Sequence, residues 1–260
     1  MKITIITVSF NAEQTIADTL QSVSSQRYGH IEHIVIDGAS KDGTVAIVNE
    51  RGSHLAKFVS EPDRGIYDAM NKGIALATGD VVGFLNADDF YASPDALERV
   101  ARAFDSPDVD ASFGDLLYVR KSDPSSIVRY WQSSDFVKGS FKRGWCPPHP
   151  TFFVRRKIYE QYGGFNLEYK IAADTEIMFR FLEVKGIKSI HIPETIVKMR
   201  TGGESNKSVA NIIHQNREIV RIINAGSPKK VSVGKFLAHK LVSRLTQFIK
   251  RPRAKSLVAR

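Results

Sequence analysis

Two adjacent carboxylates, Asp88 and Asp89, follow directly on a short apolar run at residues 81–85. Neighbouring like charges repel one another, and a hard divalent cation such as Mn²⁺ or Mg²⁺ removes that cost because it takes oxygen ligands. A cation held in this way can bind a diphosphate, so the segment predicts a metal and diphosphate site. Asp is also frequent in solvated turns, because its side chain bonds to the local backbone. From this segment alone, both interpretations stand.

Alternating strands and helices in the first ninety residues must position this pair. Apolar, β-branched runs predict buried parallel strands at residues 3–8, 31–36, 57–60 and 81–85. Helices are expected at residues 11–26, from residue 44 onward, and at 67–77. The order indicates right-handed crossovers and an α/β fold, with a doubly wound, mostly parallel sheet flanked by helices. Ligands bind such sheets beyond the carboxyl ends of the strands, where this chain has polar clusters at residues 9–11, 37–44, 61–65 and 86–89.

The pattern after residue 95 is less regular. It predicts short strands at residues 111–113, 116–120, 151–154 and 189–192, and helices to about residue 104, at 156–162 and at 174–185. Between residues 120 and 150 the sequence indicates only loops.

The second strand ends at Asp37, whose carboxylate can accept a hydrogen bond from a base or a ribose. Neither the phosphate-binding P-loop nor the GxGxxG fingerprint of dinucleotide folds occurs in the chain. A nucleotide would therefore be held by carboxylates and a metal.

These segments together resemble the family 2 glycosyltransferases over roughly residues 1–200. The resemblance rests on residues 7–11 (TVSFN), the turn at Asp37, residues 63–73 (DRGIYDAMNKG) and residues 86–89 (NADD). It implies a GT-A fold, a nucleotide-diphosphate sugar donor with UDP favoured, a divalent cation (Mn²⁺ or Mg²⁺) at the "DxD" element, and an inverting transfer.

The same resemblance implies roles for individual residues. Asp37 would contact the base and Arg64 would lie near the nucleotide, while Asp88 would be the leading metal ligand and Asp89 would lie beside the metal or donor sugar. The first position of the DxD element is Asn86 instead of aspartate, so the metal would be held more loosely. The remaining nucleotide-sugar-binding positions are Ser9, Asn11, Asp68 and Asn71.

An inverting transfer needs a general base that removes the proton of the acceptor hydroxyl, and a carboxylate can do this. The family's base opens a helix, and on the matching segment it would be Asp174, with Glu176 as the second candidate. Asp174 also stands where a helix N-cap would stand, which is a purely structural alternative.

Two further residues are expected on the acceptor side. His149 falls where relatives often carry His-Gln before a strand, although a histidine between prolines is otherwise a surface-loop residue. Arg200 stands beyond the last expected strand, where it could neutralise the leaving diphosphate, since a guanidinium matches phosphate oxygens. A solvated loop is the alternative for Arg200.

Charge and composition restrict the partners. The net charge is +9, but residues 226–260 carry ten of the 37 basic residues and no acid, which leaves 27 basic and 28 acidic residues in the body. A near-neutral body argues against a nucleic-acid groove.

The single Cys146, and the lack of a secretory or membrane-spanning apolar run, favour the cytoplasm. We expect a domain at 1–225, with a nucleotide-binding half (1–95) and an acceptor-side half (96–225), and a separate tail at 226–260.

The tail predicts an amphipathic helix. Its apolar residues recur at spacings of three and four among lysines and arginines: Val233, Phe236, Leu237, Leu241, Leu245 and Phe248. Such a helix can lie on an anionic membrane, or it can pack back onto the body with its charges in solvent.

The prediction from sequence is therefore an inverting, metal-dependent glycosyltransferase, peripheral on the inner face of the cytoplasmic membrane. Its acceptor would be a glycan or a polyprenyl-diphosphate-linked glycan in bacterial surface polysaccharide synthesis. The alternatives are a nucleotidyltransferase, whose usual glycine-rich loop with Arg and Lys is missing after the first strand, and a non-catalytic sugar- or membrane-binding protein of the same fold.

Overall fold

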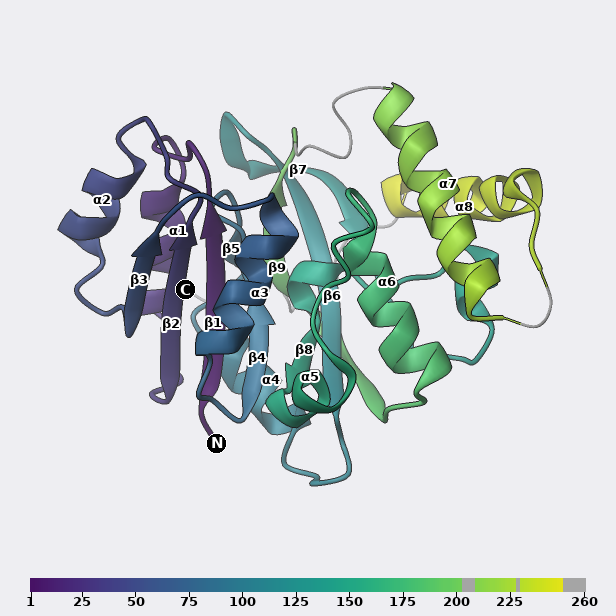
Figure 1. The fold of residues 1–260 in the computed structure, drawn as a ribbon, viewed down its shortest axis with the longest axis horizontal. Coiled ribbons are helices and arrows are strands. Elements are labelled where there is room, and N and C mark those ends of the chain that lie inside the picture. Colours follow the sequence, from purple (N-terminus) through teal and green to yellow (C-terminus); the bar gives the residue numbers. More distant parts are fainter. Residues whose placement is uncertain (203–208, 228–229, 250–260) are drawn as a thin grey trace.

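The computed structural model describes residues 1–202, 209–227 and 230–249. One nine-stranded sheet runs through the molecule in the order β3-β2-β1-β4-β8-β6-β9-β5, with β7 paired to β6 (Figure 1). The strands are β1 (Ile3–Ser9), β2 (Ile31–Asp37), β3 (Lys57–Ser60), β4 (Val81–Phe84), β5 (Phe90–Tyr91), β6 (Ala111–Arg120), β7 (Asp123–Trp131), β8 (Phe153–Arg155) and β9 (Ser189–Arg200). Strands β1 to β4 pair in parallel, which confirms the doubly wound first half.

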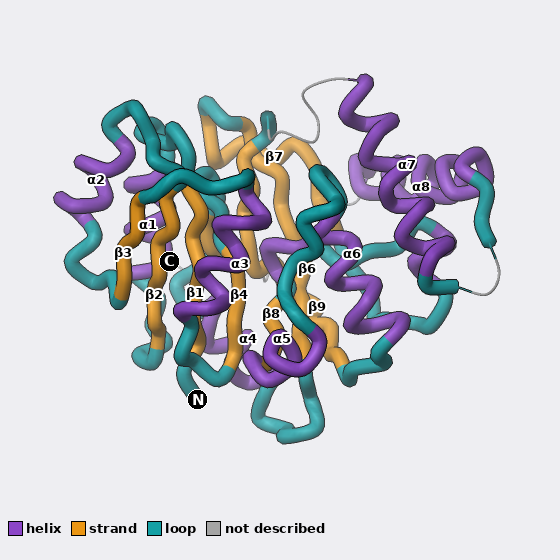
Figure 2. Tube along the Cα trace, in the orientation of Figure 1, coloured by secondary structure: helices purple, strands orange, loops and turns teal. Residues whose placement is uncertain are grey.

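Helices cover both faces of this layer, as the colouring by secondary structure shows (Figure 2). They are α1 (Ile16–Ser24), α2 (Thr44–Arg51), α3 (Ile66–Leu76), α4 (Ala96–Ala103), α5 (Arg156–Tyr162), α6 (Ala173–Phe179), α7 (Val209–Ala225) and α8 (Val233–Ile249). Because side chains alternate along a strand, Ile6 packs in one core with α3 and α6, while Ile5 packs on the other face with α4. The centre of the sheet is therefore buried on both faces.

The first helix is shorter than expected, because residues 11–15 form a loop with a bonding role of its own. Asn11 is in the left-handed region at φ 50°, and its side-chain oxygen accepts from the backbone N–H of Lys41 at 2.9 Å. The Glu13 carboxylate accepts from the backbone N–H of Gly43 at 2.8 Å. These bonds tie the end of β1 to the loop after β2, so the helix begins only at Ile16.

The second half differs more from the sequence prediction. Residues 111–113 and 116–120 form one strand, β6, and the strand expected at 189–192 extends as β9 to Arg200. Residues 123–131, expected as a loop, form β7, which is antiparallel to β6. Pro124 and two serines conceal β7 in the sequence, and as an edge strand with mostly exposed side chains it needs no apolar alternation. The helix expected at 174–185 is divided into α6 and a π-helical turn at Arg180–Val184.

The described part of the C-terminal tail packs on the body. Helix α8 lies against α7 and β7 (Figure 1), and Phe236 is only 2% exposed within the main core. The same helix leaves Val233, Leu237 and Leu241 exposed, the last at 61%. The structure shows the second alternative, packing on the body, for Phe236. Contact with a membrane through the exposed side chains stays a proposal. Residues 250–260 lie outside the described residues, and no helix within the described ranges has the length and hydropathy needed to cross a membrane.

A buried histidine pair on β2 gives the fold a pH dependence. His33 is 1% exposed, with Nε2 2.9 Å from Thr7 Oγ1 and Nδ1 3.0 Å from His54 Nε2. Burial, and next the charge of His54, lower the pKa of His33 from 6.5 to about 3. The unfolded chain therefore binds more protons between these two values, and stability is lost as the pH falls through that window.

We expect this group to lower the free energy of unfolding by about 3 kcal/mol between about pH 7.5 and 4.5. Urea unfolding of the wild type and of His33→Gln at both pH values checks this, because the variant should lose part of the pH dependence. Equal pH dependence in the two proteins would contradict it.

Candidate active site

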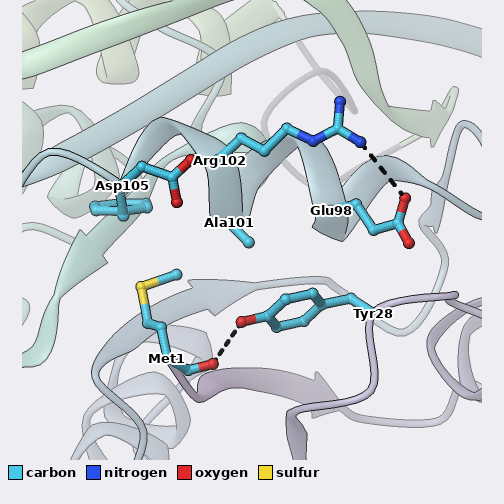
Figure 3. Close-up of a pocket in the computed structure, with 7 residues that line it drawn as sticks. Met1, Tyr28, Glu98, Ala101, Arg102 and Asp105 are labelled. Atoms are coloured by element: carbon cyan, nitrogen blue, oxygen red, sulfur yellow. Dashed lines mark hydrogen bonds and ion pairs between the residues drawn. The ribbon is translucent and has the colours of Figure 1, made fainter.

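A cavity of about 1170 Å³, here called the main cavity, lies along the carboxyl ends of the first strands and extends to α6, α7 and α8. Six residues named from the sequence line it: Ser9, Asn11, Asn86, Asp88, His149 and Asp174. Six others do not: Asp37, Arg64, Asp68, Asn71, Asp89 and Arg200. A smaller cavity of about 360 Å³, lined by Tyr28, Glu98 and Arg102 among others, contains none of the twelve (Figure 3).

The acidic element after β4 presents one carboxylate and one amide to the main cavity. Burial raises the pKa of Asp88, and the side-chain oxygen of Asn86 is buried without a hydrogen-bond partner among the described residues. Carboxylate and amide oxygens are ligands that a hard divalent cation takes, so Asp88 and the unpartnered oxygen of Asn86 fit a metal. No cluster of three or more His, Cys, Asp or Glu with metal-binding geometry occurs in the described ranges, so diphosphate oxygens and water would supply the other ligands.

Asp89 lies behind this pair and not in the main cavity, contrary to the expectation that it faces the metal or donor sugar. Its side chain is fully buried and is reached by the Asn86 amide at 3.4 Å, while Thr19 Oγ1 donates to its backbone carbonyl at 2.8 Å. Burial, with the charge of Asp88 next among the causes, raises the pKa of Asp89 well above its ordinary value. The residue therefore orients Asn86 and the loop from within the protein.

Arg200 also acts on this loop from behind. Its side chain is 5% exposed. The guanidinium donates to the backbone carbonyl of Asp88 at 2.8 Å and pairs with Asp18 of α1. The guanidinium carbon lies 4.9 Å from the centre of the Phe90 ring. The solvated-loop alternative for Arg200 is wrong, because β9 extends to Arg200 and the side chain is buried. Arg200 does not line the main cavity, and its contact with a leaving diphosphate stays a prediction. Residues 203–205, which follow in the same expected loop, lie outside the described residues.

Asp37 holds the loop after β2 instead of facing the main cavity. Its two oxygens accept four hydrogen bonds, from Ser9 Oγ, from Ser60 Oγ, and from the backbone N–H and hydroxyl of Ser40. Burial by itself would raise the pKa of Asp37, and the hydrogen bonds from Ser40, Ser60 and Ser9 outweigh it and lower the pKa. Four donors use the lone pairs of a carboxylate, so none remains for a base in this conformation.

The carboxylate that does face this end of the main cavity belongs to Asp63. A Cβ at Gly38 would lie 2.6 Å from Asp63 Oδ2, so the glycine leaves room for that carboxylate. Phe10, 64% exposed, presents its ring to the same region. Asp63 opens the motif at residues 63–73, and from the sequence it was expected either to position Arg64 or the sugar, or to face solvent.

The motif at residues 63–73 mainly builds structure around α3. Arg64 is largely exposed and pairs with Asp68 at 2.8 Å, one helical turn on. The Asn71 amide makes two bonds to the backbone of Phe165, at 2.9 and 2.8 Å. Asn71 thus fixes α3 against the loop before α6, and the Arg64–Asp68 pair holds the start of α3. Other residues of the motif, among them Asp63 and Tyr67, line the main cavity.

Asp174 stands in the first turn of α6 with its side chain in the main cavity. Its Oδ1 accepts from the backbone N–H of Thr175 at 2.6 Å and from the Tyr67 hydroxyl at 3.4 Å, and it makes no N-cap bond. Its Oδ2 accepts no hydrogen bond from the described residues. Asp174 is therefore not the N-cap of α6, and the structural alternative is wrong. Glu176 pairs with Arg180 at 2.8 Å and does not line the main cavity.

His149 lies close to the same carboxylate. Its ring stacks on Phe84 at 5.4 Å, and burial lowers its pKa while the charge of Asp174 opposes that change. A neutral imidazole at this position is a hydrogen-bonding group and adds no positive charge beside Asp174. The surface-loop alternative for His149 does not hold, because the residue is buried.

Charge divides the main cavity. Residues 8–88 contribute four carboxylates to its lining and, among the described residues, no Lys or Arg: Glu13, Asp42, Asp63 and Asp88. We call this side the donor half. These carboxylates repel a diphosphate, and a cation would offset that repulsion.

Known proteins resemble this chain in sequence. Residues 4–167 match Glycosyl transferase family 2. An uncharacterized glycosyltransferase of Mycobacterium tuberculosis is 36% identical over 188 residues, which cover 68% of each chain. A PGL/p-HBAD biosynthesis glycosyltransferase of Mycobacterium bovis is 33% identical over 180 residues, again 68% of each chain.

Solved structures share the fold at low identity. Staphylococcus aureus TarS 1-349 in complex with UDP-GlcNAc superposes with a TM-score of 0.67 and 20% identity, over 95% of this chain and 73% of that one. A mannosyltransferase from Pyrobaculum calidifontis in complex with GDP-Man and Mn²⁺ gives a TM-score of 0.65 and 22% identity, over 93% and 69%. The chain has the GT-A fold and belongs to glycosyl transferase family 2.

Proposed function

We propose that this glycosyltransferase moves a sugar from a nucleotide-diphosphate donor to an acceptor hydroxyl with inversion, and that the reaction depends on Mn²⁺ or Mg²⁺. The observation that carries the proposal is the donor half, which combines four carboxylates with the unpartnered side-chain oxygen of Asn86 beside Asp88. The complexes of the two structural neighbours, one with UDP-GlcNAc and one with GDP-Man and Mn²⁺, support a nucleotide sugar and a cation as ligands.

Asp88 and Asn86 are the residues that would hold the cation. When bound, the cation supplies positive charge to the diphosphate as it leaves. Asp89 and Arg200 would keep these two ligands in place from behind, through the Asn86 amide and the Asp88 carbonyl.

Asp174 is the proposed general base. Tyr67 and the backbone of Thr175 hold its Oδ1, which leaves Oδ2 to take the proton of the acceptor hydroxyl. The hydroxyl oxygen forms the new bond to the anomeric carbon, the bond from that carbon to the β-phosphate oxygen breaks, and the nucleoside diphosphate leaves. His149 lies beside Asp174, and burial lowers the pKa of its imidazole.

The acceptor and the cellular place follow as further parts of the proposal. A glycan or a polyprenyl-diphosphate-linked glycan of a bacterial surface polysaccharide would be the acceptor, and the enzyme would work at the inner face of the cytoplasmic membrane. Exposed Val233, Leu237 and Leu241 on the basic helix α8 could meet an anionic lipid surface. The division into halves 1–95 and 96–225 and a tail from 226 belongs to the same proposal.

A thermal-shift titration with UDP, GDP, dTDP and CDP, each with and without Mn²⁺, tests the donor site. We expect one nucleotide to raise the melting temperature only with the metal, because a ligand at about 100 times its Kd adds about 2.7 kcal/mol to stability. UDP is the expected base. No metal-dependent shift with any of the four nucleotides would overturn the proposal.

A further inference from the structure

The lining residues of the main cavity from Leu116 onward carry mostly positive charge. They include Asp174 as the one carboxylate among the described residues, and four cations: Lys121, Arg129, Lys170 and Lys240. We call this part of the lining the acceptor half. A cavity wall with several charges of one sign concentrates ligands of the other sign.

Part of this wall is the hairpin of β6 and β7. Leu116 pairs with Trp131 and Tyr118 with Arg129 across the two strands, and all four side chains line the main cavity from the same face. The rings of Tyr118 and Trp131 are 6.4 Å apart and nearly parallel, with 7° between their planes. The Arg129 guanidinium carbon lies 3.9 Å from the centre of the Tyr118 ring and 5.6 Å from that of Trp131.

The turn of the hairpin reaches the donor side. Lys121, in the turn between β6 and β7, is exposed, lines the main cavity and acts electrostatically on the carboxylate of Asp88. Lys240 of α8, a helix that packs against β7, also lines the main cavity and donates to Asn216 at 2.7 Å. Cations from the hairpin and from α8 therefore belong to the same lining as Asp174.

The size of the main cavity leaves room for a second substrate beside the donor. A volume of about 1170 Å³ exceeds the ~300–1000 Å³ typical of a site for one drug-sized ligand. Flat aromatic rings with a stacked guanidinium offer an apolar face to a sugar ring, while the guanidinium edge can bind phosphate oxygens. A neutral glycan would use the rings but would leave the four cations without a partner on the ligand.

We propose that the β6–β7 hairpin is the acceptor-binding platform of this enzyme, and that the acceptor is a sugar or carrier bearing a phosphate or diphosphate. This inference rests on the proposed function, since it assigns the second substrate of the same cavity. Trp131 and Tyr118 stack on the acceptor, and Arg129 and Lys121 bind its phosphate oxygens.

Two matched pairs of probes test the ligand chemistry by ligand-observed NMR titration of the full chain, saturated with Mn²⁺ and the nucleotide that binds best. The first pair is glucose 1-phosphate and methyl glucoside, and the second is farnesyl diphosphate and farnesol. We expect the phosphate-bearing member of at least one pair to bind about tenfold more tightly than its neutral partner. A preference in the first pair indicates a soluble sugar phosphate, and a preference in the second pair alone indicates a lipid carrier.

Variants connect that preference to the hairpin. Lys121→Gln and Arg129→Gln are expected to reduce it, and Lys57→Gln, an exposed lysine on β3 outside the main cavity, serves as the control with the same change in net charge. Lys121 lies in an exposed turn, so its variant folds even if Arg129→Gln does not. No preference in either pair, or a preference that the Lys121→Gln variant leaves unchanged, would overturn the proposal.

The nucleotide titration separates this inference from the proposed function. Metal-dependent nucleotide binding without any preference for phosphate-bearing probes would refute the platform alone. A preference carried by the hairpin without metal-dependent nucleotide binding would refute the donor-site assignment and leave the platform in place.

Discussion

Asp174→Asn is expected to lower kcat by about 10²- to 10⁴-fold, the usual contribution of a general base, while nucleotide binding stays unchanged. The amide keeps the size of the carboxylate and its bonds to Thr175 and Tyr67, but it cannot take a proton. The loss should therefore appear in turnover and not in folding or in donor affinity. Release of the nucleoside diphosphate, measured under saturating donor, follows turnover directly.

Glu176→Gln is the matched control. Glu176 stands two residues further along the same helix turn and pairs with Arg180 outside the main cavity, so its variant removes a neighbouring charge without touching the acceptor side. We expect near-normal turnover from it. Equal activity of Asp174→Asn and the wild type would refute the assignment of the base and would favour a non-catalytic binding protein.

Asp88→Asn is expected to remove the metal dependence of nucleotide binding and to lower kcat/KM by about 100-fold or more, because a bound cation is worth several kcal/mol to the departing charge. The change replaces a carboxylate that lines the main cavity next to the unpartnered oxygen of Asn86. Thermal shifts with the nucleotide, with and without Mn²⁺, measure the first effect, and initial rates at varied donor concentration measure the second.

Glu13→Gln provides the control for charge. Glu13 lines the same donor half, and its bond to the backbone of Gly43 can be kept by the amide oxygen. This variant should retain the metal-dependent shift. If the metal-dependent thermal shift persists in Asp88→Asn but vanishes in Glu13→Gln, the cation binds at Glu13 and not at Asp88.

The sequence predicted the parts of the site that follow from strand ends. Parallel strands bring their carboxyl ends to one edge, so the strand pattern alone was enough to place Ser9, Asn11 and Asp88 together. The roles of Asp37 and Arg200 could not be predicted in this way. Arg200 bonds to Asp18, 182 residues away, and Asp37 takes donors from three separate segments. Such partners depend on how distant elements pack, which local patterns do not contain.

The acceptor half was missed for a related reason. Strand β7 has few buried side chains, so it shows none of the alternation by which a strand is recognised, and the pairing of Tyr118 with Arg129 exists only once the hairpin forms. On such an edge strand, the proposed ligand contacts constrain the residue types more than core packing does. The alternation of apolar and polar residues is therefore weak in this part of the proposed binding surface.

Helix α8 supplies both Phe236 and Lys240 to the wall of the main cavity, and it also carries the exposed Leu237 and Leu241. A chain ended at Ala225 would thus lose a wall of the reaction chamber together with any anchor. If the proposed membrane contact holds, replacing this helix would change the lining of the main cavity and the membrane contact together.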